Sequence, residues 1–184
     1  MIQPIYLYGS EVLREKAEDI DLNGKEYIEE LVRDLKDTLA HADGCGLAAP
    51  QIGISKRALI VDGTGMGDVY PYLKDFRRTM LNPVIVWQSD KNVVYQEGCL
   101  SIPGIYCDVL RPASMTVEYY DENGEKVTET FDKFGCRMVQ HEMSHLDGDM
   151  FVDHVAQIRR KMIAKKLLSI SRGRVSAHYN TKIK

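Results

Sequence analysis

The sequence predicts an α+β fold in which short antiparallel strands surround one central helix, with a further helix toward each end of the chain. Three observations predict this fold class. Apolar residues recur at helical spacing over 25–41, apolar and polar residues alternate over 114–120 and 126–131, and a second helical pattern covers 132–146. Strands that follow one another through tight turns, with helices grouped apart from them, are typical of α+β proteins.

The length and composition are those of one globular domain, and we expect a single domain over 1–184. The chain is 44% hydrophobic and 28% charged, and it contains no apolar run of membrane-spanning length. Its first residues lack the pattern of an export signal. The four cysteines are therefore expected to be free thiols or metal ligands, and the expected compartment is the cytoplasm.

Charge is distributed unevenly along the chain. Nine basic residues and no acidic residue follow Asp153, whereas the first 153 residues contain fifteen basic and 27 acidic residues. This basic C-terminal segment has two interpretations: a solvated helix face, or a surface that contacts an anionic partner such as RNA.

The first predicted helix covers 25–41. Residues 1–24 before it are expected to be mostly loop, with a short helix near 10–16. The helix has apolar residues at helical spacing, and Asp43-Gly44 ends it. Its predicted inward residues are Ile28, Leu31, Val32, Leu35 and Leu39.

A glycine-containing segment, 44–53, follows this helix. Gly44-x-Gly46-x-x-Ala49 superficially matches a dinucleotide-binding pattern, but that pattern requires a preceding strand, and here a helix precedes it. The glycines instead indicate backbone that lies close to a bound molecule. Gln51 is a neutral hydrogen-bond donor that could reach a substrate oxygen.

Strands are expected in the middle of the chain. Asp121-Glu122-Asn123-Gly124 joins the two alternating segments into a hairpin. Residues 62–78 are expected to form an exposed loop and 102–104 a turn. The remaining predicted strands are 58–61, 80–87, which Pro83 breaks or offsets, and 93–95.

The helix over 132–146 contains the motif that carries the chemistry, His141-Glu142-x-x-His145, and Gly148 closes it. Residues four apart share one face of a helix, so both histidines can bind one metal ion. Glu142 then lies beside the metal, where its carboxylate can accept a proton from water.

A last helix is expected from about 153 to 171, and the residues beyond Gly173 are expected to be loose. The predicted inward residues of this helix are Val155, Ile158, Met162 and Leu167 or Leu168.

The third metal ligand must come from upstream of the motif. The extended metallopeptidase pattern needs a histidine at the position of Phe151, and the downstream acidic residues all lie within eight residues of His145. The upstream candidates are His41, Cys45, Cys99, Cys107 and Cys136. Spacing favours Cys99 over Cys45, because Cys99 lies at a strand end, but it leaves both open. Two imidazoles and one thiolate would leave a fourth position for water, as in a catalytic site.

Three motifs together resemble the peptide deformylase family. They are Gly44-Cys45-Gly46-Leu47-Ala48-Ala49-Pro50-Gln51, Glu97-Gly98-Cys99-Leu100-Ser101, and Gln140-His141-Glu142-x-x-His145-Leu146-x-Gly148. Members of this family remove the formyl group from the N-terminal formyl-methionine of newly made polypeptides. The resemblance implies Cys99, His141 and His145 as metal ligands. It also implies Fe²⁺ as the usual metal, with Zn²⁺, Ni²⁺ or Co²⁺ possible, whereas ligand rules alone indicate zinc.

The resemblance also implies a mechanism. Metal-bound water is the nucleophile, Glu142 is the general acid and base, and the side chain of Gln51 and the backbone N–H of Leu100 stabilise the oxyanion. Gly46 leaves room for the substrate backbone.

Further residues are expected to support this site. A helical stripe that ends at the metal includes Phe134 and Met138, which we expect either in the core or in the methionine pocket, and Cys45 and Tyr95 are further pocket candidates. We also expect Glu97 to pair with Arg111. Arg137 lies near the stripe and is expected at the pocket rim. Formyl-methionyl nascent peptides are the implied substrates, and the basic segment 154–184 is a candidate contact with the ribosome.

One residue departs from the family pattern: Ser144 stands where the family usually has Asp. We expect a local rearrangement there rather than a loss of activity. Three alternatives are weighed against a deformylase: a metallopeptidase, a protein with a closed structural metal site, and a relative that has lost activity. The residue at 151 argues against the first, and the absence of a second cysteine in Cys-x-x-Cys spacing argues against the second.

Overall fold

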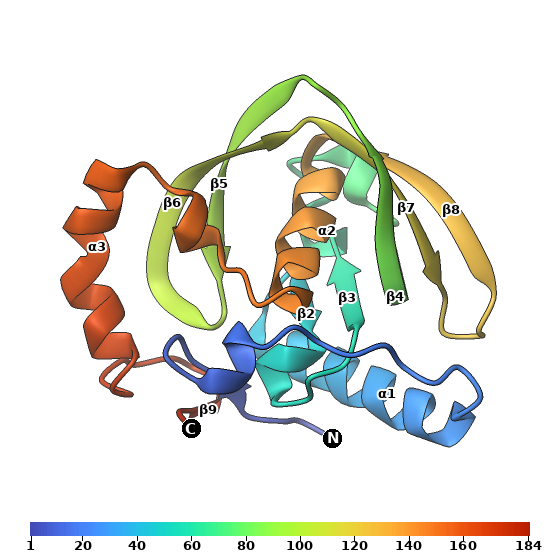
Figure 1. The fold of residues 1–184 in the computed structure, drawn as a ribbon, viewed down its shortest axis with the longest axis horizontal. Helices are drawn as coiled ribbons and strands as arrows, with labels where there is room; N and C mark the ends of the chain where they lie inside the picture. The colour runs from blue at the N-terminus through green and yellow to red at the C-terminus, as the bar shows by residue number, and fades with distance from the viewer.

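The computed structural model describes residues 1–184, and helix α2 (Lys133–Leu146) runs through its middle. A five-stranded sheet lies on one side of α2 and a two-stranded sheet on the other (Figure 1). Helix α1 (Lys25–Ala42) lies beneath the larger sheet, and α3 (Gln157–Ile170) lies against the outside of the smaller one. The predicted α+β class, with antiparallel strands around a central helix, is confirmed.

The five-stranded sheet has the order β2-β3-β4-β7-β8, and all its neighbours are antiparallel. Its strands are β2 (Gly46–Ala48), β3 (Ala58–Asp62), β4 (Arg77–Gln88), β7 (Ser114–Tyr120) and β8 (Lys126–Asp132). The predicted hairpin is β7–β8. Pro83 offsets β4 as expected, because the register with β7 shifts between Leu81 and Val84.

The smaller sheet pairs β5 (Asn92–Cys99) with β6 (Ile102–Pro112). Strand β6 was not expected, since Pro103-Gly104 indicates a turn. Its side chains nevertheless alternate, with Ile105, Cys107 and Val109 buried. The buried Arg111 continues this inward series, and a charge in a core position conceals the alternation from sequence reasoning.

Helix α1 forms because one face is apolar. It buries Leu31, Leu35 and Leu39 against β2 and β3, and Asp43 ends it in the left-handed conformation with φ 53°. Helix α2 ends at Leu146, and the chain turns away two residues later at Gly148, whose φ is +72°. A Cβ at Gly148 would lie 2.5 Å from the carbonyl oxygen of Arg14, so no other residue fits there without a shift.

The inward face of α3 differs from the prediction. Ile163, Leu167 and Ile170 are buried, as is Val155 just before the helix, whereas Ile158 and Met162 are 74% and 69% exposed. The helix begins only at Gln157, after a separate 3-10 turn, Phe151–His154. Its contacts with β6 select which of several apolar residues point inward, and the local pattern does not. No helix here combines the length and apolarity that a membrane crossing requires.

The prediction that the residues beyond Gly173 are loose is wrong. Strand β9 (Thr181–Lys182) pairs in parallel with β1 (Ile5–Tyr6), so the chain returns from α3 to its first strand (Figure 1). The Ile5 N–H donates to the Asn180 carbonyl at 2.8 Å, and the Leu7 N–H donates to the Lys182 carbonyl at 2.9 Å. These bonds hold the segment on the body of the molecule.

Candidate metal centre and active site

Three potential ligand atoms meet between α2 and the end of β5. Cys99, His141 and His145 each offer one such atom, and the three atoms lie within 4.8 Å of one another. Helical spacing places the two histidines on one face of α2, and the short turn from β5 to β6 brings the thiol to them. The Cys99 Sγ lies 3.3 Å from His145 Nε2. Cys45, the alternative thiol, is not part of this cluster.

Glu97 orients one of the two imidazoles. Its Oε1 lies 2.8 Å from His141 Nδ1, which leaves Nε2 of that ring for a metal. The expected pair with Arg111 is present: the guanidinium donates two bonds to the carboxylate, at 2.8 and 3.1 Å. Burial alone would raise the pKa of Glu97, but the bonds from His141 and Arg111 outweigh it and lower this pKa to about 2.

Arg137 also reaches this carboxylate. It donates to Glu97 at 3.0 Å and to the carbonyls of Val93 and Val109 at 2.7 Å each. The side chain is 2% exposed and belongs to the lining of the cavity beside the histidines, so it lies at the pocket as expected. It joins α2 to both strands of the smaller sheet. The sequence signal for such a role was a lone arginine between apolar neighbours, four residues before His141.

Ser144 occupies the position where the resemblance predicted an acid. Its hydroxyl accepts a bond of 2.9 Å from Arg111 and donates one of 3.0 Å to the carbonyl of Gln140. The base that a family Asp would meet is therefore Arg111. The serine keeps a hydrogen bond to that base without supplying a negative charge.

The residues present fit a divalent transition metal. One thiolate and two imidazoles are a donor set that such ions prefer, and a carboxylate behind the first imidazole is the usual support. Burial lowers the pKa of His145, and the positive charge of His141 adds to this effect, so the imidazole of His145 stays neutral as a ligand must. Burial opposes charge on His141, yet interactions with Cys99 and Glu97 raise its pKa well above the ordinary value. The same negative groups would favour a metal cation.

Glu142 lies against the glycine segment and lines the cavity beside the histidines. Its Oε2 is buried and has no hydrogen-bond partner. Burial raises the pKa of Glu142 to about 7, although the nearby His141 opposes this effect. A Cβ at Gly46 would lie 2.4 Å from Glu142 Oε1, so the glycine makes room for this carboxylate as well as for backbone.

Gln51 presents its amide N–H groups to the turn after β5. Its Oε1 accepts a bond of 2.9 Å from the Ala48 N–H, which fixes the orientation of the amide. Its Nε2 donates to Ser101 Oγ at 3.1 Å and lies 3.5 Å from Cys99 Sγ. Gln51 was predicted at the site, whereas its partner Ser101 was not predicted from the sequence.

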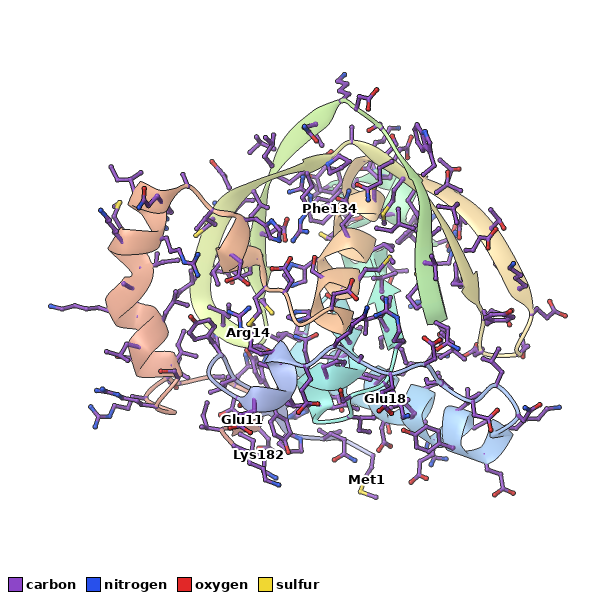
Figure 2. The ribbon with its side chains drawn as sticks, in the orientation of Figure 1. Met1, Glu11, Arg14, Glu18, Phe134 and Lys182 are labelled. Atoms are coloured by element: carbon purple, nitrogen blue, oxygen red, sulfur yellow. The ribbon has the colours of Figure 1, made fainter.

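A cavity of ≈ 930 Å³ contains these groups. Cys45, Gly46, Phe134 and Met138 line it, as does the turn at Leu100. Figure 2 shows Phe134 at the upper end of α2. Tyr95 is not in the lining; its ring packs edge-on against Phe134 with centroids 5.4 Å apart, so the structure does not bring it to the pocket as expected.

The segment 176–179 also lines this cavity, although the sequence predicts no role for it at the site. The hydroxyl of Tyr179 donates a bond of 2.8 Å to the carbonyl of Leu100. No local pattern connects two residues that lie 79 positions apart in the sequence.

Comparison with known proteins identifies the family. The sequence model for polypeptide deformylase matches residues 2–161. The peptide deformylase of Christiangramia forsetii is 39% identical over 188 residues, covering 97% of this chain and 94% of that protein. The peptide deformylase of Pseudothermotoga lettingae is 40% identical over 172 residues, covering 94% of each.

Solved structures agree. The peptide deformylase of Thermus thermophilus superposes with a TM-score of 0.82 at 33% identity, covering 95% of this chain and 100% of that one. A peptide deformylase from Legionella pneumophila gives a TM-score of 0.82 at 34% identity, covering 94% of this chain and 96% of that one. Similarity over nearly the full length in both sequence and fold shows that this chain belongs to the peptide deformylase family.

Proposed function

We propose that Cys99, His141 and His145 hold the metal with which this deformylase removes formyl groups from nascent peptides, and that residues 1–184 form one catalytic domain. The observation that carries the assignment is the convergence of one sulfur and two imidazole nitrogens next to a buried carboxylate. When bound, the metal supplies Lewis acidity that activates water near neutral pH.

Glu142 moves the proton in this proposal. Its carboxylate accepts a proton from the attacking water and later delivers it to the amine that leaves. A pKa near 7 suits both steps, because the group can hold or release a proton at neutral pH. Its free Oε2 faces no competing protein donor.

Two donors stabilise the negative charge that develops on the formyl oxygen: the side-chain amide of Gln51 and the backbone N–H of Leu100. The bond from Ala48 already fixes the Gln51 amide, so little reorganisation is needed during the reaction. Loss of one such donor typically raises the barrier by about 2.7–4 kcal/mol.

Phe134 and Met138 form the apolar wall for the methionine side chain, with Cys45 and Gly46 on the facing strand side. These residues line the same cavity as Glu142, so a methionine bound there places its formyl group near the ligand cluster. The combination of an apolar wall and a few convergent polar groups is that of a small-molecule site.

The decisive assay measures formate release from formyl-Met-Ala-Ser by the Fe²⁺-loaded protein. We expect turnover by the wild type and a loss of about 10²- to 10⁴-fold in Glu142→Ala. Glu26→Ala, at an exposed position on α1, is the matched control and should keep full activity. No formate release from the wild type would reject the proposed function.

The ligand assignment has a test that does not depend on activity. In Co²⁺-loaded protein, Cys99→Ser should abolish the thiolate-to-metal absorption band, and Cys45→Ser should retain it. The opposite pattern would make Cys45 the metal ligand in place of Cys99.

We propose Fe²⁺ as the physiological metal on the strength of the family resemblance, with Zn²⁺, Ni²⁺ or Co²⁺ as substitutes that the same donors accept. Metal analysis of protein purified without oxygen should find iron in excess over zinc. A predominance of zinc would overturn this assignment.

We also propose the cytoplasm as the compartment and the ribosome as a partner of α3, because the substrates are nascent chains. Lys161, Lys165 and Lys166 are exposed on α3 and form no ion pairs, so they can meet a phosphate-rich surface. Changing all three to Glu should abolish cosedimentation with ribosomes at low salt. The same charge change at Lys16, Lys25 and Lys91 is the control and should leave it intact; equal effects of the two triple variants would contradict a specific contact.

A further inference from the structure

The chain after α3 follows a defined path back across the molecule. We call residues 175–182 the C-terminal strap. Val175 packs on the apolar cluster under α3, and Tyr179 packs on the separate cluster that contains α1 and β2. Strand β9 then pairs with β1, and Figure 2 shows Lys182 beside the N-terminal segment near Glu11. The strap therefore bridges two parts of the core.

The strap forms part of the wall of the active-site cavity. Its residues 176–179 line the same cavity as His141 and Glu142, together with the end of α1. His178 Nε2 lies 3.1 Å from the carbonyl of Ala42, which fixes the strap to α1 at this point. The rings of His178 and Tyr179 also pack edge to face, with centroids 5.0 Å apart.

Tyr179 contacts the residue beside the candidate ligand Cys99. Its hydroxyl donates to the Leu100 carbonyl at 2.8 Å. The next residue is held from two other sides: the Tyr8 N–H donates to the Ser101 carbonyl at 2.8 Å, and Gln51 donates to the Ser101 hydroxyl. Removing the Tyr179 bond would leave the Leu100 end of this turn as the part with the fewest constraints.

Two parts of the molecule that lie apart in Figure 2 contribute to the lining of the cavity. Phe134 lies at the upper end of α2 in Figure 2, whereas the strap returns along the lower side of the molecule, where Lys182 is labelled. His141 and Glu142 follow Phe134 about two turns farther along α2 and line the same cavity. If the methionine side chain occupies the part lined by Phe134, the rest of the peptide has the part lined by the strap available. A volume of ≈ 930 Å³ is near the upper limit for a drug-sized ligand and exceeds what formyl-methionine alone requires.

We propose that the C-terminal strap is a working part of this active site. Tyr179 is a positioning residue that orients Leu100, and residues 176–178 contact the peptide beyond its formyl-methionine. This inference rests on the proposed function, because it assumes that Leu100 donates to the oxyanion and that a formylated peptide fills the cavity. It assigns a catalytic consequence to a segment that carries no metal ligand and none of the family motifs.

The first test isolates the hydroxyl. Tyr179→Phe keeps the ring in its apolar contacts and removes only the bond to Leu100. We expect kcat for formyl-Met-Ala to fall about five-fold, which corresponds to about 1 kcal/mol, the net value of one hydrogen bond. KM should not change, because the Leu100 N–H acts in the transition state. Tyr27→Phe, half-exposed on α1 and without a hydroxyl bond, is the control.

All variants are assayed well below their unfolding midpoints, so that lost stability does not enter the rate. A purely structural role for the strap predicts an unchanged kcat in Tyr179→Phe, and that result would overturn the positioning role.

The second test addresses the peptide contact. Ala177→Trp fills space where the strap lines the cavity. We expect kcat/KM for formyl-Met-Ala-Ser to fall about ten-fold and that for formyl-Met amide to change less than two-fold. Ala164→Trp, on the exposed face of α3, is the control for the bulk of the side chain. Equal values for both substrates in Ala177→Trp and wild type would overturn the contact.

A negative result in either strap test can be distinguished from failure of the proposed function. A wild-type protein that releases no formate from any peptide rejects the deformylase assignment itself. An active wild type with unaltered Tyr179→Phe and Ala177→Trp variants rejects only the role of the strap.

Discussion

Glu97 is the buried carboxylate that pairs with the basic side chains around the site. It is 4% exposed and meets Arg111, Arg137 and His141 at once. Two guanidiniums therefore share one carboxylate, and the remaining hydrogen bond of Arg111 goes to the neutral Ser144. A buried charge that loses its partner is strongly destabilising, so this network restricts what each of its members can become.

Ser144→Asp should give this network a second carboxylate in addition to that of Glu97. The new group would lie near the guanidinium of Arg111, which already donates to Ser144 at 2.9 Å. We expect the free energy of unfolding at pH 7 to rise by about 1 kcal/mol, because a hydrogen bond to a charged group is worth more than a neutral one. Urea denaturation measures the change. Ser144→Asn is the uncharged control, and a stabilisation of the same size in that variant would exclude a charge effect.

Gly46→Ala tests the close contact between β2 and the general base. The new Cβ would meet the Glu142 side chain at 2.4–2.8 Å, so the carboxylate must move. We expect kcat to fall by about 100-fold or more, since a displaced acid–base group loses most of its contribution. Gly24→Ala introduces only an ordinary contact of 3.4 Å and serves as the control. Full activity in Gly46→Ala would show that Glu142 adjusts freely.

At the scale of elements, α2 and α3 differ in how much of their surface is buried. Nearly all of α2 is buried, because the two sheets enclose it and its polar residues serve the site. Helix α3 contacts β6 along one narrow face and leaves its basic residues and several apolar ones in solvent. Its packing therefore depends on few side chains.

Ile163→Ala should destabilise the protein by about 2–5 kcal/mol, because Ile163 is 3% exposed in the cluster between α3 and β6. The neighbouring Met162→Ala should stay within about 0.5 kcal/mol, since Met162 is 69% exposed. Thermal unfolding of the two variants measures both values. The reverse order would mean that α3 packs through the face predicted from sequence.

At the scale of the whole molecule, distant segments close the structure around α2. The segment before α1 reaches the end of α2, where Arg14 donates to the Gly148 carbonyl and to Asp153. The strap returns to β1 on the same side (Figure 1). The two ends of the chain thus support the turn at Cys99–Ser101 and the end of the ligand helix.

The Arg14–Asp153 pair predicts a dependence of stability on pH. Partial burial by itself would raise the pKa of Asp153, but the bonds from Arg14 and the Met150 N–H outweigh it and lower this pKa. A carboxyl with a lowered folded-state pKa contributes stability above its unfolded-state value, about 3.9, and loses it as the pH falls through the folded-state pKa. Asp153→Asn should therefore be less stable than wild type at pH 7, and the difference should shrink below about pH 4. Urea titrations at several pH values test this, with the exposed Asp90→Asn as the control; a constant difference would contradict the linkage.

The sequence by itself determined the fold class, the helices α1 and α2, the hairpin β7–β8 and the motif residues His141, Glu142 and His145. Each of these is encoded by residues within a few positions of one another, where helical or strand periodicity and turn chemistry act directly. The residues also indicated Cys99 and Gln51, and the family resemblance favoured Cys99 more firmly over Cys45 and gave Gln51 its oxyanion role, because their motifs are also contiguous.

Only the tertiary structure decided the rest. It made Arg137 a buried partner of Glu97, gave Ser144 a hydrogen bond from Arg111, and turned the residues after Gly173 into a wall of the cavity. Each of these depends on a contact between segments that lie far apart in the sequence. Such contacts follow from how sheets and helices pack together, and no local pattern records them.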